Sequence, residues 1–268
     1  MPLPPPAPDS TCLITGASSG IGSEIARELA QRGHGVTLVA RREERLRELA
    51  DDLTNTHGIR AEIVGASVAD HDGRAELAAE IERRGLTVET LVNNAGYGSA
   101  GRFQDLDPDT EEGMVRLNVE AVVGFCGIYA PRMVARGRGS ILNVASTAAF
   151  QPLPYQATYA ASKAFVNSFS EALHIDLAGT GVTVTALCPG PTETEFAEEA
   201  GMGSWGDGLP SFLVDDARDV ARAAVEGMEA GSRSVVPGVH NVISALGGRF
   251  APRTLLLPAL GRFYPVGR

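Results

Sequence analysis

The chain of 268 residues is poor in the residue types that build disulfide frameworks and metal centres. Its three cysteines, Cys12, Cys126 and Cys188, are far apart and lie inside apolar runs, and its five histidines are scattered. No C-x-x-C pair and no His/Cys cluster accompanies them. We therefore interpret the cysteines as reduced core residues and expect neither a disulfide nor a metal site.

Long hydrophobic runs, an export signal and an excess of positive charge are lacking as well. No window reaches the roughly 18 to 20 apolar residues that a membrane-spanning helix needs. The start of the chain has neither the basic nor the apolar region of a signal peptide. We therefore expect a cytoplasmic protein without a transmembrane segment. The formal net charge of −10 repels phosphate backbones and argues against nucleic acid as a partner.

The composition is that of an ordinary globular protein, and no Gly/Ser-rich linker divides the chain, so one domain is expected. Residues 1–10 carry Pro2, Pro4, Pro5, Pro6 and Pro8, which predicts a disordered tail because proline donates no backbone hydrogen bond. Residues 11–238 form the predicted domain. Within it, residues 191–214 interrupt the pattern of elements and are expected to form a substrate loop.

Short runs rich in Val, Ile and Leu alternate with amphipathic stretches along this domain. Parallel strands buried on both faces by crossover helices have this pattern. It predicts a Rossmann-type, doubly wound α/β fold with a seven-stranded parallel sheet, whose ligands bind at the carboxyl ends of the strands. The expected strands are Cys12–Thr15, Val36–Ala40, Ala61–Val64, Thr90–Asn93, Ser140–Ala145, Thr183–Cys188 and Ser234–Val236. The expected helices are Ile21–Gln31, Glu43–Leu53, Arg74–Arg84, Thr110–Arg136, Thr158–Ala178 and Asp216–Gly227.

A glycine-rich loop follows the first expected strand and opens into the first helix. Its sequence, from Thr15 to Gly22, is TGASSGIG. Such a loop lets the backbone approach a pyrophosphate, toward which the helix directs its N–H groups and its positive end. No Gly-Lys-Ser/Thr follows, which excludes a Walker-type phosphate loop. The residues that we assign to cofactor binding here are Gly16, Ser18, Ser19, Gly20, Ile21 and Gly22.

The spacing Gly-x-x-x-Gly-x-Gly resembles the short-chain dehydrogenase/reductase family, and so does Asn93-Asn94-Ala95-Gly96 at the end of the fourth strand. In that family the second motif supports the central sheet and contacts the cofactor through its backbone, which implies the same for Asn94, Ala95 and Gly96. An Asn/Gly turn is the alternative interpretation of this motif alone.

The end of the second strand bears on the choice of nicotinamide cofactor. A carboxylate there binds the adenosine ribose, whereas an arginine accommodates a 2′-phosphate. This strand ends in Ala40, followed by Arg41 and Arg42, which predicts NADP(H), with NAD(H) as the alternative. Otherwise the two arginines simply begin a solvated, charged helix. Where the family usually has an Asp beside the adenine, this chain has Ser67-Val68, so the resemblance implies a weaker contact.

Tyr159 and Lys163 lie one turn apart on one helical face, as in a proton-transfer pair. Tyrosine has a pKa of about 10, which a nearby ammonium and an oxidised nicotinamide would lower toward the working pH. Alone, this spacing is common by chance, and a half-buried tyrosine beside a snorkelling lysine is the alternative interpretation.

Three further motifs match the same family. Ser146, thirteen residues before Tyr159, matches the serine that binds the substrate oxygen. Asn118 matches the asparagine that links the lysine to solvent through water, and a locally bonded helix residue is its alternative interpretation. The segment after the sixth strand resembles Pro-Gly-x-x-x-Thr, which holds the nicotinamide carboxamide. Its residues here are Pro189, Gly190, Thr192 and Thr194, with Pro191 as a departure.

The resemblance spans about Thr11 to Thr194 and implies hydride transfer between nicotinamide and a carbonyl or alcohol carbon. Tyr159 would act as acid and base, and Lys163 would also bind the nicotinamide ribose. Apolar residues such as Phe196, Met202, Trp205, Leu209 and Phe212 predict an apolar small-molecule substrate. A non-enzymatic NADP(H) sensor of the same fold is the alternative. A serine hydrolase is disfavoured because no Gly-x-Ser-x-Gly elbow occurs.

The final 30 residues, 239–268, mix leucines and phenylalanines with four arginines. We expect a helical extension that packs on the core or at a subunit contact. A basic, apolar flap that binds a greasy substrate or touches a membrane surface is the second interpretation. The family resemblance implies a homodimer or homotetramer formed through the helices Thr110–Arg136 and Thr158–Ala178.

Overall fold

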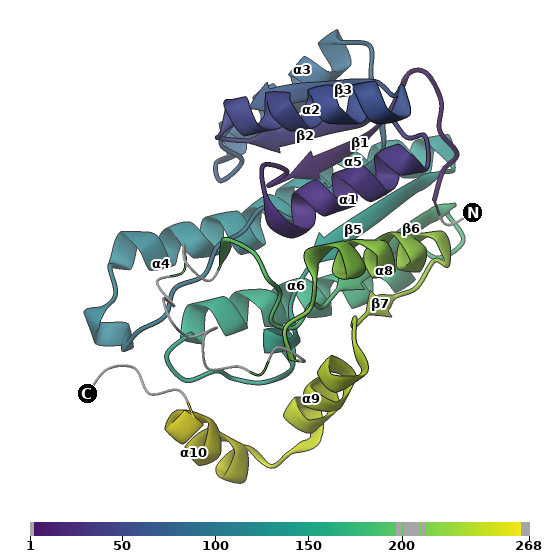
Figure 1. Ribbon diagram of the computed structural model, residues 1–268. Coiled ribbons are helices and arrows are strands. Elements are labelled where there is room, and N and C mark those ends of the chain that lie inside the picture. The colour runs from purple at the N-terminus through teal and green to yellow at the C-terminus, as the bar shows by residue number, and fades with distance from the viewer. Residues whose placement is uncertain (1–2, 197–199, 201–209, 211–212, 264–268) are drawn as a thin grey trace.

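A parallel sheet of seven strands forms the centre of the computed structural model, which describes residues 3–196, 200, 210 and 213–263. The strand order is β3-β2-β1-β4-β5-β6-β7, and every pair is parallel. Figure 1 shows helices on both faces of the sheet. The strands are β1 (Ser10–Thr15), β2 (Val36–Ala40), β3 (Ala61–Gly65), β4 (Thr87–Asn93), β5 (Gly139–Val144), β6 (Val182–Leu187) and β7 (Ser234–Val235). The predicted doubly wound fold is confirmed.

The helices pack on the sheet in two layers, each with its own apolar core. One core joins α1, α2 and α8 to the sheet through residues such as Ile25, Leu46 and Val225. The other joins α3, α5 and α6 through Leu77, Phe125 and Val166. Residues 10–15 and 139–144 are buried throughout, as expected for strands covered on both faces. The helices are α1 (Gly20–Gln31), α2 (Glu43–His57), α3 (His71–Arg83), α4 (Pro108–Val115), α5 (Ala121–Arg136), α6 (Ala157–Asp176), α8 (Ala217–Glu229), α9 (Val239–Phe250) and α10 (Arg253–Phe263).

Local sequence sets several of these boundaries. The side chains of Asp70, Asp107 and Asp216 each accept a backbone hydrogen bond at the start of α3, α4 and α8, which satisfies N–H groups that have no partner inside the helix. Gly58 and Gly137 end α2 and α5 in the left-handed conformation, which glycine adopts at little cost. Short 3-10 turns, η1 (Phe103–Asp105) and η3 (Thr147–Phe150), complete the elements near the site.

The predicted single helix Thr110–Arg136 is interrupted. The chain forms α4, then one π-helical turn, η2 (Arg116–Glu120), and then α5. By length and composition the stretch Pro108–Arg136 would suffice to cross a membrane, so the expectation that no such window exists was wrong. The stretch is apolar because it packs on the core, where Met114, Phe125 and Met133 are buried.

The proline-rich start of the chain also differs from the expected disordered tail. Leu3 packs against the core of α1 and α2, Pro4 is buried, and Ser10 already belongs to β1. The backbone N–H of Thr87 donates to the carbonyl of Asp9 at 2.8 Å. Most of the expected substrate loop, residues 191–214, lies outside the described residues.

Candidate active site

The candidate residues converge on one edge of the sheet. Because all strands are parallel, the segments that follow β1 to β6 emerge on the same side, and these segments carry the predicted motifs. The strands β1 and β4 are neighbours at the centre, although three helices and two strands separate them in sequence. The glycine loop and the segment Asn94 to Gly96 therefore lie side by side at the point where the strand order reverses.

Thr15 and Asn94 fasten these two segments together. The Thr15 hydroxyl donates to the Val92 carbonyl at 3.3 Å and accepts the backbone N–H groups of Asn94 and Ala95 at 3.1 and 3.0 Å. The Asn94 amide donates to the carbonyls of Thr15 and Gly16 at 3.0 and 3.1 Å. Asn94 is therefore a support of the loop, and Thr15, which sequence reasoning had passed over, is its partner.

The glycine loop has the geometry that a pyrophosphate needs. Gly16 has a φ of 67°, and a Cβ there would lie 2.8 Å from Nδ2 of Asn94 and 2.9 Å from Cα of Ala95, so only glycine fits. Ser19 precedes α1 without capping it by its side chain. The N–H groups of the first turn, around Gly20, Ile21 and Gly22, are thus available to an anion. These residues fit the phosphates of a dinucleotide.

Arg42 connects the glycine loop to the segment that follows β6. Its guanidinium donates to the hydroxyls of Ser18 and Ser19, the latter at 2.8 Å, and to the carboxylate of Glu195 at 2.8 Å. Arg45 donates to the other oxygen of Glu195 at 2.6 Å. The two arginines hold the pKa of the Glu195 carboxyl below its usual range. Glu195 was missed because nothing in the local sequence links it to residues about 150 positions earlier.

The remaining predicted cofactor residues lie at the same edge. Arg41 is exposed at the end of β2, Ser67 is exposed after β3, and Val68 is buried. After β6, the carbonyl of Pro189 accepts the backbone N–H of Thr147 at 2.8 Å, which joins this segment to the end of β5. A Cβ on Gly20 would lie 3.0 Å from Cγ2 of Thr194. The loop after β1 and the segment Pro189, Gly190, Thr192 and Thr194 are therefore in contact range.

Ser146 and Tyr159 form the polar centre of the site. Ser146 follows β5, and its Oγ accepts the backbone N–H of Ala148 at 3.1 Å. Tyr159 lies in the first turn of α6 and is partly buried. Burial raises the pKa of Tyr159 to about 12, and a side-chain hydrogen bond with Ser146 opposes that rise. The phenol therefore keeps its proton at neutral pH.

Lys163 lies one turn after Tyr159 and is buried. Its ammonium donates to the Val144 carbonyl at 2.9 Å and lies 5.8 Å from the centre of the Tyr159 ring. Burial lowers the pKa of Lys163 from 10.5 to about 8. The alternative interpretation of a snorkelling surface lysine is wrong, because the ammonium points into the molecule.

Asn118 lies in η2 and is buried. Its Oδ1 accepts the backbone N–H of Tyr97 at 3.1 Å, and its Nδ2 donates to the Tyr97 carbonyl at 2.9 Å and to Ser162 Oγ at 3.1 Å. A Cβ on Gly96 would lie 2.8 Å from Asn118 Oδ1 and 3.6 Å from Lys163 Nζ. Asn118 and Lys163 thus flank the same glycine.

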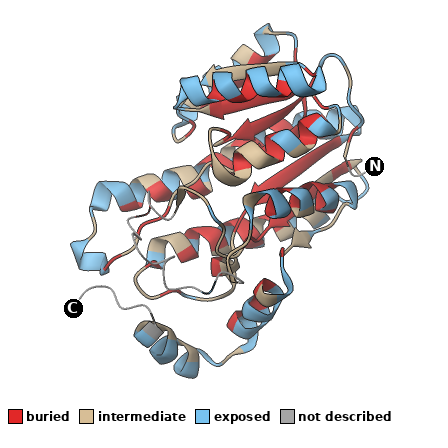
Figure 2. Ribbon diagram, in the orientation of Figure 1, coloured by how far each residue is buried: buried red, intermediate tan, exposed pale blue. Residues whose placement is uncertain are grey.

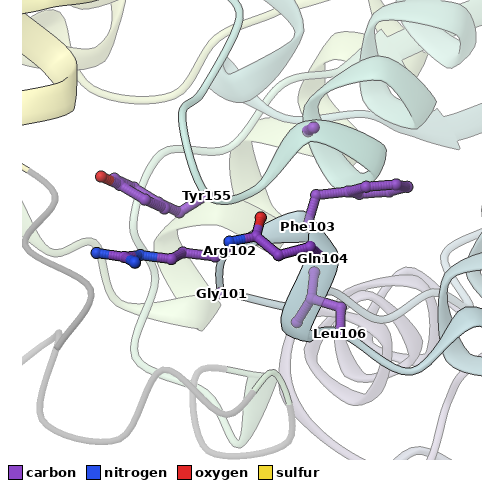
Figure 3. A pocket seen from close by; sticks show the side chains of 7 residues that line it. Gly101, Arg102, Phe103, Gln104, Leu106 and Tyr155 are labelled. Atoms are coloured by element: carbon purple, nitrogen blue, oxygen red, sulfur yellow. The ribbon is translucent and has the colours of Figure 1, made fainter.

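An aromatic ring packs against Tyr159, and a cavity opens at the start of the same helix. The ring of Phe196 lies 5.4 Å from that of Tyr159, centre to centre. A cavity of about 360 Å³ opens at the start of α6 between Gly101, Arg102, Phe103, Gln104, Leu106, Tyr155 and Ala157. Figure 3 shows Tyr155 and Arg102 extending to the same side of it. Tyr155 has a φ of 67°, a strained conformation for an aromatic residue. Met202, Trp205, Leu209 and Phe212 lie outside the described residues.

Comparison with known proteins agrees with this geometry. Residues 10–204 match the family model described as short chain dehydrogenase. Sulfoacetaldehyde reductase 2 of Chromohalobacter salexigens is 40% identical over 186 residues, 69% of this chain and 73% of that protein. A very-long-chain 3-oxoacyl-CoA reductase of Anas platyrhynchos is 33% identical over 80% of this chain and 67% of its own length.

Solved structures give the same result. A short-chain dehydrogenase from Sphingobium yanoikuyae, in complex with NADPH, superposes with a TM-score of 0.79 at 32% identity, over 97% of each chain. Serine dehydrogenase in its closed form with NADP+ superposes with a TM-score of 0.76 at 31% identity, over 84% of this chain and 93% of the other. The chain belongs to the short-chain dehydrogenase/reductase family and is an NAD(P)-dependent oxidoreductase that acts on alcohol and carbonyl groups.

Proposed function

We propose that the protein reduces or forms a carbonyl group on an apolar small molecule with NADP(H), and that Tyr159 is the acid and base. The observation that carries this proposal is the position of Tyr159 between Ser146 and Lys163. Tyr159 shares a hydrogen bond with Ser146 and lies on the same helical face as Lys163. A bound nicotinamide supplies or accepts the hydride.

In the direction of reduction, Tyr159 gives its proton to the substrate oxygen. Its raised pKa keeps the phenol protonated until that transfer. Ser146 holds the substrate oxygen beside the phenol. The charge of Lys163, within reach of the Tyr159 ring, stabilises the phenolate that remains. Asn118 positions the turn of chain beside Lys163 through its contacts with Tyr97. In oxidation the same groups act in reverse.

The preference for NADP(H) rests on the end of β2. Ala40 leaves no carboxylate to bind the ribose, and Arg41 and Arg42 follow it. Arg42 already donates to Ser18 and Ser19 in the glycine loop, where the adenosine side of a dinucleotide would enter. The structural relatives that carry NADPH or NADP+ support the same preference.

The apolar substrate is supported by the surroundings of Tyr159. Its ring packs against Phe196, and Leu260 of α10 packs against the small cluster of Ala148, Leu153 and Ala160 beside it. These contacts leave aliphatic and aromatic carbon around the reacting oxygen, which favours ketones, aldehydes and secondary alcohols with apolar substituents.

A Tyr159→Phe variant tests the proposal. We expect it to fold and to bind NADPH, measured by nicotinamide fluorescence, but to lose turnover by roughly a hundredfold or more. The assay follows NADPH consumption over a panel of apolar ketones and aldehydes. It is repeated with NADH, for which we expect a lower kcat/KM.

Tyr155→Phe is the matched control, because it removes the same hydroxyl four residues earlier, from the cavity of Figure 3. It should retain most of the turnover. Full activity of Tyr159→Phe would refute the role of the phenol, and a higher kcat/KM with NADH would refute the cofactor preference.

A further inference from the structure

Among the residues that the structure describes, none covers an apolar stripe on the outward face of α9. Its residues follow the spacing i, i+3, i+4, i+7 and i+11, which places them on one side of a helix. Val239, Ile243 and Phe250 are 77%, 65% and 74% exposed. Leu255 and Leu257 of α10 are exposed as well. The members of the stripe are Val239, Val242, Ile243, Leu246 and Phe250.

The opposite side of α9 packs against the rest of the described structure. The stripe therefore faces outward. The buried Asn241 donates to the Asp215 carboxylate at 2.6 Å and to the Pro237 carbonyl at 2.8 Å. Near the other end, a Cβ on Gly248 would lie 2.7 Å from the Gln151 side chain. Figure 1 shows α9 and α10 set apart from the layered body, and Figure 2 shows their exposed sides.

The charge of this extension is of one sign. From Val239 to Arg268 the sequence has four arginines and no acidic residue, in a protein with a net charge of −10. Arg249 lies 5.9 Å from the Phe250 ring centre. Arg253 donates to the carbonyls of Gly248 and Phe150. Among the described residues, no carboxylate forms an ion pair with either guanidinium.

We propose that the α9 stripe and its arginines bind a bilayer surface that carries anionic headgroups. An interfacial helix buries an apolar face at the headgroup boundary and places cationic side chains beside the lipid phosphates. A second copy of the chain fits less well. A twofold interface would pair the patch with itself. It would bring together arginines that form no ion pair with any described carboxylate.

The surface lies beside the candidate active site. Both α9 and α10 contact η3, which directly follows Ser146, through Gln151 and the Phe150 carbonyl. Leu260 of α10 and Tyr159 both pack against the small buried cluster of Ala148, Leu153 and Ala160. The docked face would therefore be next to the apolar surroundings of the site, although lipid binding does not depend on the proposed reaction.

Co-sedimentation of the full chain with vesicles tests the proposal. We expect binding to phosphatidylcholine vesicles that contain phosphatidylglycerol, weaker binding to phosphatidylcholine alone, and release at high salt. Phe250→Gln should weaken the vesicle affinity roughly tenfold, since one phenyl group leaves the interface. Arg249→Gln should weaken it about fivefold.

Phe103→Gln is the matched control. Phe103 is 66% exposed on η1, so the same substitution removes a similar apolar group from another place and should leave vesicle binding unchanged. The proposal is overturned if anionic vesicles do not bind the protein, or if both phenylalanine variants weaken binding equally. It is also overturned if Phe250→Gln only dissociates a dimer, which light scattering would detect.

Discussion

At Tyr159 and Lys163, burial has a larger effect on the two pKa values than the side chains have on each other. The sequence suggested that the ammonium and an oxidised nicotinamide would together lower the pKa of the phenol. The chain's own groups set a different balance, because burial raises the pKa of Tyr159 to about 12 and lowers that of Lys163 to about 8. The ammonium is directed at the Val144 carbonyl and donates no hydrogen bond to the phenol. Each side chain is thus pushed toward its neutral form.

Lys163 allows a direct measurement of this effect because it is the only lysine of the chain. Protein labelled with 13C at lysine Cε should give a single side-chain resonance. We expect its chemical shift to titrate near pH 8, well below the ordinary 10.5. A midpoint near 10.5 would show that the ammonium is hydrated and that the buried hydrogen bond to Val144 is not formed.

The same shift has a defined effect on stability. Since the folded-state pKa of Lys163 lies below the unfolded value, the unfolded chain binds more protons between about pH 8 and 10.5. The contribution of this group to the free energy of unfolding therefore rises with pH across that window and is absent below it. Buried thiols such as Cys12, with a pKa raised to about 12, and Tyr159 act in the opposite direction at higher pH, so the NMR titration is the cleaner measurement.

At the scale of elements, the π-helical turn η2 is the feature that shapes the site. A π-turn holds one more residue than an α-turn, and such turns are frequent at functional sites. Here the turn directs Asn118 inward, where both ends of its amide are bonded to the backbone of Tyr97. Asn118 therefore joins the start of α5 to the segment that follows β4.

Asn118→Ala should lower the free energy of unfolding by about 2 to 4 kcal/mol. The substitution removes the hydrogen bonds to the Tyr97 backbone and to Ser162 and leaves buried polar groups without partners. Urea unfolding at pH 7 measures the change. Asn55→Ala on the exposed side of α2 is the control and should cost less than about 0.5 kcal/mol. Equal losses would mean that Asn118 is not a structural link.

The elements that sequence predicted well are those whose pattern is local. The observed bounds of β2, Val36–Ala40, equal the predicted ones, because a short strand-forming run lies between Gly35 and Arg41. The π-turn was not foreseen, since residues 116–120 have ordinary helical character and the contacts of Asn118 are made with residues distant in sequence. The motifs placed Ser146, Tyr159 and Lys163 at one edge, but not the direction of the Lys163 ammonium.

At the scale of the whole molecule, contacts between distant segments decide what local sequence leaves open. The first residues were expected to be disordered because prolines donate no hydrogen bonds, yet Leu3 and Pro4 gain burial against the body. Glu195 likewise reaches Arg42 and Arg45 from about 150 positions later. Neither contact has a periodicity or a motif that would reveal it.

The contact of Glu195 joins the start of α2 to the segment after β6, across the glycine loop. In this arrangement a carboxylate neutralises part of the positive charge of Arg42 and Arg45. A 2′-phosphate that binds beside Arg41 and Arg42, as proposed for NADP(H), adds negative charge at the same corner. Glu195 and the phosphate then compete for the same guanidinium groups.

Glu195→Gln should therefore tighten the binding of 2′,5′-ADP about two- to fivefold, as expected for partly exposed ion pairs, and leave 5′-AMP unchanged. Calorimetry with the two nucleotides measures both affinities without any substrate. Glu193→Gln, an exposed residue of the same segment, removes one charge without touching Arg42 and should change neither affinity. Equal changes for both nucleotides would mean that Glu195 acts on the shared part of the nucleotide, and the 2′-phosphate would then have to lie away from Arg42.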